Sequence, residues 1–149
     1  MKISIGCDHG GFLLKEEVKK YLLSSGREVV DCGCFDESRV DYPVYGIEVA
    51  KSVSEKKCDY GVLICTTGIG MSIVANKIKG VRAALVTNSE AAVLTREHNN
   101  SNVICLGAKF TSVSEATDYV EKFITTEFTY GRHEARVNMI MEAEKWVER

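Results

Sequence analysis

The stretch YGVLICTTGIGMS at residues 60–72 decides the predicted fold of this chain. Its first half, Tyr60–Cys65, is an almost unbroken apolar run, which is typical of a central parallel strand covered on both faces. Its second half is rich in glycine and leads directly into a predicted helix that runs to Ile78. The segment therefore predicts a buried strand that ends in a sharp turn into a helix.

The same alternation of short apolar runs and amphipathic stretches continues in both directions along the chain. The other predicted strands are Lys2–Cys7, Glu28–Cys32, Val81–Val86 and Asn102–Leu106. One further predicted helix carries Leu14, Val18, Tyr21 and Leu22 on one face and is capped at Gly26. The others are Pro43–Glu55, Ser89–His98, Ser114–Ile124 and Glu134–Glu148. Regular βα alternation gives a parallel sheet with right-handed crossovers and helices on both faces. We therefore expect one α/β domain over residues 1–149: a three-layer, doubly wound, Rossmann-like, five-stranded parallel sheet with an extra C-terminal helix.

The composition excludes several classes of function. The chain has 149 residues, of which 45% are hydrophobic and 27% charged, as in an ordinary globular domain. Nineteen Lys and Arg against 21 Asp and Glu give a net charge of −2, so no bulk positive field favours nucleic acid or an anionic membrane. No apolar run approaches the roughly 20 residues of a membrane span, and residues 1–7 are too short for a signal peptide. We expect a cytoplasmic protein whose six cysteines are thiols.

The turn at residues 65–72 combines a possible anion site with a thiol. Its two glycines allow a tight turn, and the N–H groups of the first helical turn are free to receive an anion. Cys65 lies immediately before this helix start, where partial positive charge favours the thiolate. A glycine-eased turn without a ligand and an inert buried thiol are the alternatives. A dinucleotide fingerprint and a P-loop are excluded, because Ile73 replaces the third glycine and Phe12 the phosphate-binding lysine.

An acid and an imidazole, Asp8 and His9, follow the first predicted strand. The carboxyl ends of parallel strands meet at one edge of a sheet, so these side chains are expected beside Cys65. The three histidines do not cluster, and the other cysteines lack a second pair at ligand spacing. No metal site is therefore expected.

Two further polar groups lie late in the chain. His98 and Asn99 end a predicted helix, where a histidine is often only a partner of the helix dipole. Arg132 and Arg136 are four residues apart, so their guanidinium groups could share one helix face and bind a phosphate or carboxylate dianion. A solvated basic face is the alternative for this pair.

Taken together, these segments resemble the type B ribose-5-phosphate isomerases, in the family that also contains the galactose-6-phosphate isomerase subunits. The resemblance spans nearly the whole chain, and five motifs in order are more specific than any one of them. The motifs are Gly6–Gly11, Asp41–Pro43, Thr67–Ser72 with Ala75–Lys77, His98–Asn99 with Asn102–Val103 and Leu106–Gly107, and Gly131–His133 with Arg136–Val137.

The resemblance implies reversible isomerisation of ribose 5-phosphate and ribulose 5-phosphate through a cis-enediolate, without a metal or another cofactor. It implies that Cys65 moves a proton between C1 and C2, while Thr67 and His98 assist ring opening. Backbone N–H groups of the glycine loop would hold the enediolate oxygen. The implied substrate-binding residues are Asp8, His9, Thr66, Gly68, Ile69, Gly70, Asn99, Lys109, Arg132 and Arg136. Lys109 and Thr66 depart from the family pattern, in which arginine and glycine are common at these positions.

The resemblance also implies a homodimer, or a dimer of dimers, with shared active sites. Cys65 and the glycine loop would come from one chain, and His98 with Asn99 from the other. The C-terminal helix, at about residues 134–148, carries an apolar stripe of Val137, Ile140 and Met141, and we expect this helix to pack on the partner subunit.

Other functions stay open at this point. An isomerase of six-carbon phosphosugars, such as allose 6-phosphate or galactose 6-phosphate, would differ in pocket length, which the sequence does not reveal. A non-catalytic phosphosugar-binding protein would need neither Cys65 nor His98. A redox protein is disfavoured because Cys65 has no C-x-x-C partner.

Overall fold

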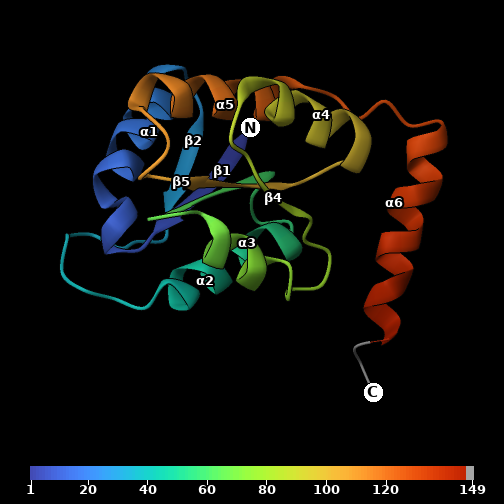
Figure 1. The fold of residues 1–149 in the computed structure, drawn as a ribbon, viewed down its shortest axis with the longest axis horizontal. Coiled ribbons are helices and arrows are strands. Elements are labelled where there is room, and N and C mark those ends of the chain that lie inside the picture. Colours follow the sequence, from blue (N-terminus) through green and yellow to red (C-terminus); the bar gives the residue numbers. More distant parts are fainter. Residues whose placement is uncertain (147–149) are drawn as a thin grey trace.

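A five-stranded parallel sheet forms the middle layer of the computed structural model, which describes residues 1–146 (Figure 1). The strands are β1 (Lys2–Cys7), β2 (Glu28–Asp31), β3 (Tyr60–Cys65), β4 (Ala83–Leu85) and β5 (Val103–Gly107). Their order is β2-β1-β3-β5-β4, so β2 lies on one side of β1, and β4 and β5 lie on the far side of β3, with β5 between β3 and the edge strand β4. This order confirms the doubly wound sheet and places its switch point between β1 and β3.

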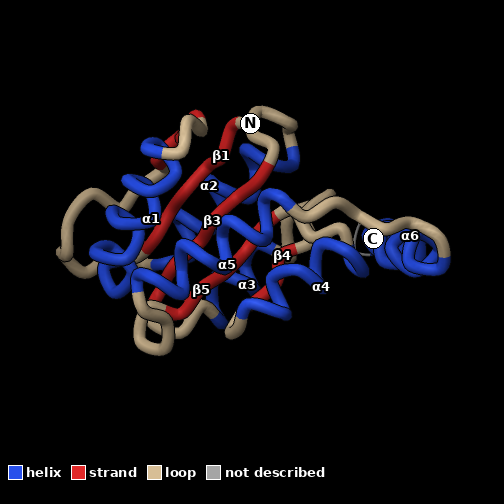
Figure 2. The backbone as a smooth tube through the Cα atoms, turned by 90° about the horizontal axis from the view of Figure 1, so that it is seen from above, coloured by secondary structure: helices blue, strands red, loops and turns tan. Residues whose placement is uncertain are grey.

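Helices cover both faces of the sheet (Figures 1 and 2). One face carries α1 (Phe12–Ser24), α4 (Ser89–Asn99) and α5 (Val113–Thr125), and the other carries α2 (Tyr42–Ser54) and α3 (Ile69–Ala75). Successive residues of a strand point to opposite faces, and β3 shows this clearly. Val62 and Ile64 belong to the apolar core on one face, whereas Leu63 and Cys65 belong to the core on the other.

Most predicted elements are confirmed with bounds that differ by one or two residues, but β4 and α3 are shorter than predicted. The helix ends at Ala75 instead of Ile78, and the strand covers Ala83–Leu85 instead of Val81–Val86. The Asn76 side chain, directly after α3, contacts β4. Its Nδ2 donates to the Ala83 carbonyl and its Oδ1 accepts from the Ala83 N–H, both at 2.9 Å, so a side chain pairs with the edge of β4.

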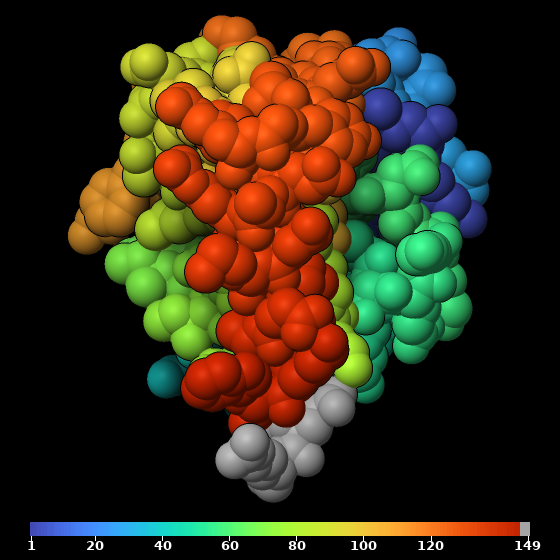
Figure 3. All heavy atoms as spheres, turned by 90° about the vertical axis from the view of Figure 1, so that its right-hand side faces the viewer, coloured from blue at the N-terminus to red at the C-terminus, as the bar shows by residue number. Residues whose placement is uncertain are grey.

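The last helix, α6 (Arg132–Ala143), continues into a 3₁₀ turn at Glu144–Trp146. The predicted end at Glu148 lies outside the described residues. Figures 1 and 2 show α6 apart from the three layers, and Figure 3 shows it as a ridge across one side of the molecule. Val137 is buried and Met141 half-buried, but Ile140 is 47% exposed. The predicted stripe is thus only partly covered within the chain.

None of the helices in residues 1–146 has both the length and the apolar character of a membrane span.

Candidate active site

Cys65 ends the middle strand of the sheet, with β1 on one side and β5 on the other. Its side chain is nearly buried, at 5% exposure, and Sγ accepts a hydrogen bond from the Gly68 N–H at 3.1 Å. This backbone contact fixes the position of the sulfur at the end of the strand. The structure therefore places Cys65 in direct contact with the glycine turn.

The glycine turn is held tightly against the neighbouring strand. Gly68 has a φ of +76°, and a Cβ at this position would lie 2.7 Å from the Leu85 side chain and 2.8 Å from the Leu106 carbonyl carbon. Only glycine meets both conditions without strain. Thr67 is half-buried in the turn, and its Oγ1 accepts from the Ile69 N–H at 3.4 Å. The fold thus places the hydroxyl of Thr67 beside the backbone N–H groups that follow Cys65.

Asp8 lies at the same edge of the sheet, directly after β1. Its side chain is 7% exposed, its N–H donates to the Ile64 carbonyl at 3.2 Å, and Oδ1 accepts from the Gly11 N–H at 3.2 Å. Thr66, whose side chain is exposed, reaches toward the same place, because its Oγ1 occupies the space that a side chain on Gly10 would need. A fixed carboxylate and a hydroxyl therefore converge near the thiol.

His9 and Lys109 complete this edge. His9 Nδ1 accepts from the Val40 N–H at 3.2 Å, so in the neutral ring the hydrogen is on Nε2, which is left as a donor. Lys109 donates its backbone N–H to the Thr66 carbonyl at 3.0 Å, and its side chain is exposed. We call Cys65, Thr67, Asp8 and His9 the carboxyl-edge cluster.

The remaining predicted residues lie elsewhere. His98 and Asn99 are in the last turn of α4, and Arg132 and Arg136 are in the first half of α6. His133, one residue after Arg132, stacks on His98 with ring centroids 4.3 Å apart and planes 14° from parallel. The set His98, Asn99, Arg132, His133 and Arg136 is called the helix-end cluster.

The two clusters are at opposite ends of the strands. The α4 helix runs back along the sheet, and Arg96 near its end donates to the Tyr60 hydroxyl at 3.0 Å. Tyr60 is the first residue of β3, whereas Cys65 is the last. The fold therefore does not bring His98 to Cys65 within one chain.

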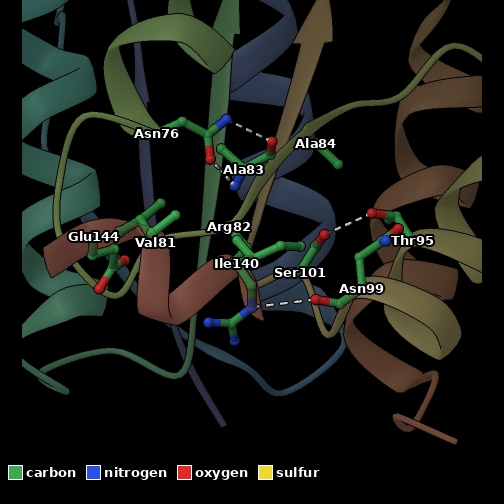
Figure 4. Close-up of a pocket in the computed structure, with 11 residues that line it drawn as sticks. Asn76, Val81, Arg82, Ala83, Ala84, Thr95, Asn99, Ser101, Ile140 and Glu144 are labelled. Atoms are coloured by element: carbon green, nitrogen blue, oxygen red, sulfur yellow. Dashed lines mark hydrogen bonds between the residues drawn. The ribbon is translucent and has the colours of Figure 1, made fainter. Parts of the chain in front are cut away.

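A groove of about 470 Å³ lies between the edge of β4 and α6 (Figure 4). Arg82 reaches into it and donates from Nε to the main-chain carbonyls of Asn99 at 3.2 Å and Asn100 at 2.9 Å. The lining residues are Asn76, Val81, Arg82, Ala83, Ala84, Thr95, Asn99, Ser101, Ile140, Ala143 and Glu144. The groove thus adjoins the helix-end cluster and contains no member of the carboxyl-edge cluster.

The family described as Ribose/Galactose Isomerase matches residues 3–140. The chain belongs to this isomerase family. It is 40% identical over 144 residues to ribose-5-phosphate isomerase B of Escherichia coli (strain K12), with 97% of each chain covered.

Solved structures of similar isomerases have the same fold. Ribose-5-phosphate isomerase B of Clostridium thermocellum is 46% identical, with a TM-score of 0.97 and 99% of each chain covered. The enzyme from Mycoplasma genitalium, solved with bound ribulose-5-phosphate, is 40% identical, with a TM-score of 0.93, 97% of this chain and 96% of that chain covered.

Sequence reasoning assigned no role to two residues of this isomerase that the structure places at the clusters. His133 forms the stack with His98, so the prediction that the histidines do not cluster is wrong for these two, which meet because α4 and α6 lie side by side. Tyr42 covers the glycine turn, because a Cβ on Gly70 would lie 2.7 Å from its ring. Both residues stand inside motifs of the family resemblance, so their positions were visible in the sequence. Their contacts depend on segments that are distant along the chain.

Proposed function

We propose that this isomerase interconverts ribose 5-phosphate and ribulose 5-phosphate, with Cys65 as the proton-transfer base. The observation that carries the proposal is the Cys65 thiol held at 3.1 Å from the Gly68 N–H, at the switch point of the sheet. Ligands of doubly wound sheets bind at this point. The bound ribulose-5-phosphate of the Mycoplasma genitalium enzyme supports the choice of substrate.

In the proposed reaction Cys65 removes the proton from C2 of the open-chain aldose and returns it to C1. The proton of the C2 hydroxyl passes to O1, so that C1 becomes an alcohol and C2 the ketone. The negative charge that develops on the enediolate oxygens is stabilised by backbone N–H groups of the turn from Thr66 to Gly70, whose hydrogen bonds strengthen as the charge forms. The N–H of Gly68 donates to the sulfur instead. Asp8 binds a sugar hydroxyl.

Ring opening precedes this step, because the sugar is mainly a furanose. The C1–O4 bond breaks, a proton leaves the C1 hydroxyl, and a proton reaches O4. Thr67 and His98 assist these transfers in our proposal. His98, however, lies at the opposite end of β3 from Cys65, and so a single chain cannot bring the two together.

We therefore propose a homodimer with shared sites. One protomer supplies the carboxyl-edge cluster, and its partner supplies the helix-end cluster. Asn99 of the partner subunit binds a hydroxyl, while His9 and the partner's Arg132 and Arg136 bind the phosphate. The exposed face of α6 supports this arrangement, because Ile140 is 47% and Met139 73% exposed. Lys109, at the carboxyl edge, adds a positive charge but lacks the guanidinium group with which an arginine can bind a phosphate through two hydrogen bonds.

No metal or other cofactor takes part in the proposed reaction, since the glycine turn supplies the charge stabilisation. In residues 1–146, no group of three His, Cys, Asp or Glu side chains is arranged to hold a metal ion. Dialysis against a strong chelator should leave turnover unchanged. Loss of activity that one divalent ion restores would contradict this part of the proposal.

The Cys65→Ala variant tests the proton-transfer role. We expect kcat to fall by about 10²-fold or more, because a general base contributes on this scale. Cys58→Ala is the matched control, since Cys58 is an equally buried thiol that precedes the other end of β3. Thermal melting shows whether both variants fold. Turnover of Cys65→Ala at the level of Cys58→Ala would refute the role.

A family that includes galactose isomerases makes a six-carbon phosphosugar the second candidate substrate. Turnover of ribose 5-phosphate, allose 6-phosphate and galactose 6-phosphate should be compared at equal concentration. We expect the highest kcat/KM with ribose 5-phosphate. Binding of all three without turnover by the wild-type protein would instead indicate a phosphosugar-binding protein.

A further inference from the structure

The stack of His133 on His98 joins the start of α6 to the end of α4. The ring centroids are 4.3 Å apart and the planes are 14° from parallel, a face-to-face contact between two imidazoles. His98 is in the last turn of α4, and His133 is the second residue of α6. The contact therefore depends on how the two helices are placed, and it restricts the plane of each ring.

The chain segment that leads into α6 is tied to the same turn of α4. Thr129 donates to the Glu97 carbonyl twice, from its N–H at 3.2 Å and from its Oγ1 at 2.8 Å. His133 then donates its own N–H to the Tyr130 carbonyl at 3.1 Å. The main chain thus holds the His133 backbone in place beside α4, independently of the ring contact.

The charged groups around His133 disfavour its protonated form. Partial desolvation of the ring and the facing His98 lower the pKa of His133, and both helices contribute other charged groups. Arg132 and Arg136 of α6 lower it further, whereas Glu97 of α4 acts in the opposite direction. These surroundings therefore favour the neutral form of the ring that His133 presents to His98, which reduces charge repulsion in the stack.

We propose that His133 is a positioning residue for His98, whose ring it holds by stacking in the plane required for proton transfer during sugar ring opening. The inference rests on the proposed function, because ring opening is the step in which His98 acts. An imidazole transfers a proton only when its nitrogen lies within hydrogen-bond reach of the reacting oxygen. A ring free to rotate about its side-chain bonds would lose this geometry for much of the time.

Two substitutions separate stacking from other roles of the imidazole. His133→Phe keeps a flat ring of similar size but removes both nitrogens and the titration. His133→Ala removes the ring. If stacking is the role, phenylalanine should rescue what alanine loses. If the imidazole itself bound the phosphate, the two variants would be equally deficient.

The stack can be measured without substrate. In proton NMR spectra, the ring protons of His98 should carry a ring-current shift from the stacked neighbour, with assignments checked in His98→Gln. We expect this shift to persist in His133→Phe and to disappear in His133→Ala. An unchanged His98 spectrum in His133→Ala would overturn the stack in solution.

The kinetic test separates ring opening from proton transfer at carbon. Turnover of ribose 5-phosphate requires ring opening, whereas exchange of the C1 proton of acyclic ribulose 5-phosphate in D₂O requires only enediolate formation. In His133→Ala we expect ribose 5-phosphate turnover to fall about tenfold while C1 exchange stays within about twofold of wild type. His133→Phe should keep both rates within about threefold of wild type.

The outcomes distinguish this inference from the proposed function. Equal loss of turnover and exchange in His133→Ala, or equal deficiency of the two variants, would overturn the positioning role while Cys65→Ala still reports on the base. Absence of phosphosugar turnover in the wild-type protein would overturn both proposals.

Discussion

The carboxyl-edge and helix-end clusters are built in different ways. The carboxyl-edge cluster is formed by strand ends and a tight turn, with Cys65 and Asp8 at 5% and 7% exposure. The helix-end cluster stands on the ends of two helices, and Arg132 and Arg136 are exposed. The carboxyl-edge cluster is held in place by the strands whose ends it follows. In the helix-end cluster the His98–His133 stack is the contact that orders side chains, and the arginines face solvent.

The glycines of the two clusters show the same contrast. Gly68 and Gly131 both have positive φ, of +76° and +55°. At Gly68 a Cβ would meet Leu85 and Leu106 within 3 Å, whereas at Gly131 it would meet nothing within 4 Å. The helix-end cluster belongs to family motifs, but within one chain its arginines face solvent. A subunit that completes the active site of its neighbour would present such a surface.

The largest expected effect comes from mixing two inactive variants. Cys65→Ala damages the carboxyl-edge cluster and His98→Ala the helix-end cluster. If the two clusters meet across a dimer, hybrids formed by unfolding and refolding contain one intact site and one doubly damaged site. Since half of random dimers are hybrids, activity should recover to roughly a quarter of wild type.

The control for this experiment is each variant refolded alone, which should remain inactive. Native mass spectrometry confirms that hybrids form. Hybrids without activity would show that each chain contains a complete active site and that the two clusters do not meet across a dimer.

A smaller effect is expected from the arginines of the helix-end cluster. Arg132→Ala and Arg136→Ala should each raise KM for ribose 5-phosphate by about tenfold, because a charge-assisted phosphate contact contributes on the order of 1.5–3 kcal/mol. Lys20→Ala is the control, since Lys20 is an exposed cation on α1. Kinetics with unphosphorylated ribose should be poor in the wild type and unchanged in the variants. A KM near that of Lys20→Ala would show that these arginines do not bind the phosphate.

The smallest effect concerns the backbone. Gly68→Ala adds a clash to an unfavourable φ, so the free energy of unfolding should fall by about 2–4 kcal/mol. Gly131→Ala has only the backbone strain and should lose about 1–2 kcal/mol. Urea denaturation measures both. Equal losses would mean that the carboxyl edge relaxes as easily as the helix ends.

Much of the fold could be predicted because apolar residues repeat with different periods in strands and in helices. The β3 strand was predicted with its observed bounds, Tyr60–Cys65, from one apolar run. The β4 strand was predicted too long, and the N–H of Arg82, just before the observed strand, donates to the Asn102 side chain at 2.8 Å. No local pattern signals that contact.

For the site, the sequence by itself indicated the candidate residues and determined which edge of the sheet holds Asp8, His9 and Cys65, because parallel strands direct their carboxyl ends to one edge. Only the tertiary structure decided that His133 stacks on His98. The reason is physical: this contact depends on the path of α4 across the sheet and on the placement of α6. Both are set by packing between segments that no periodicity connects.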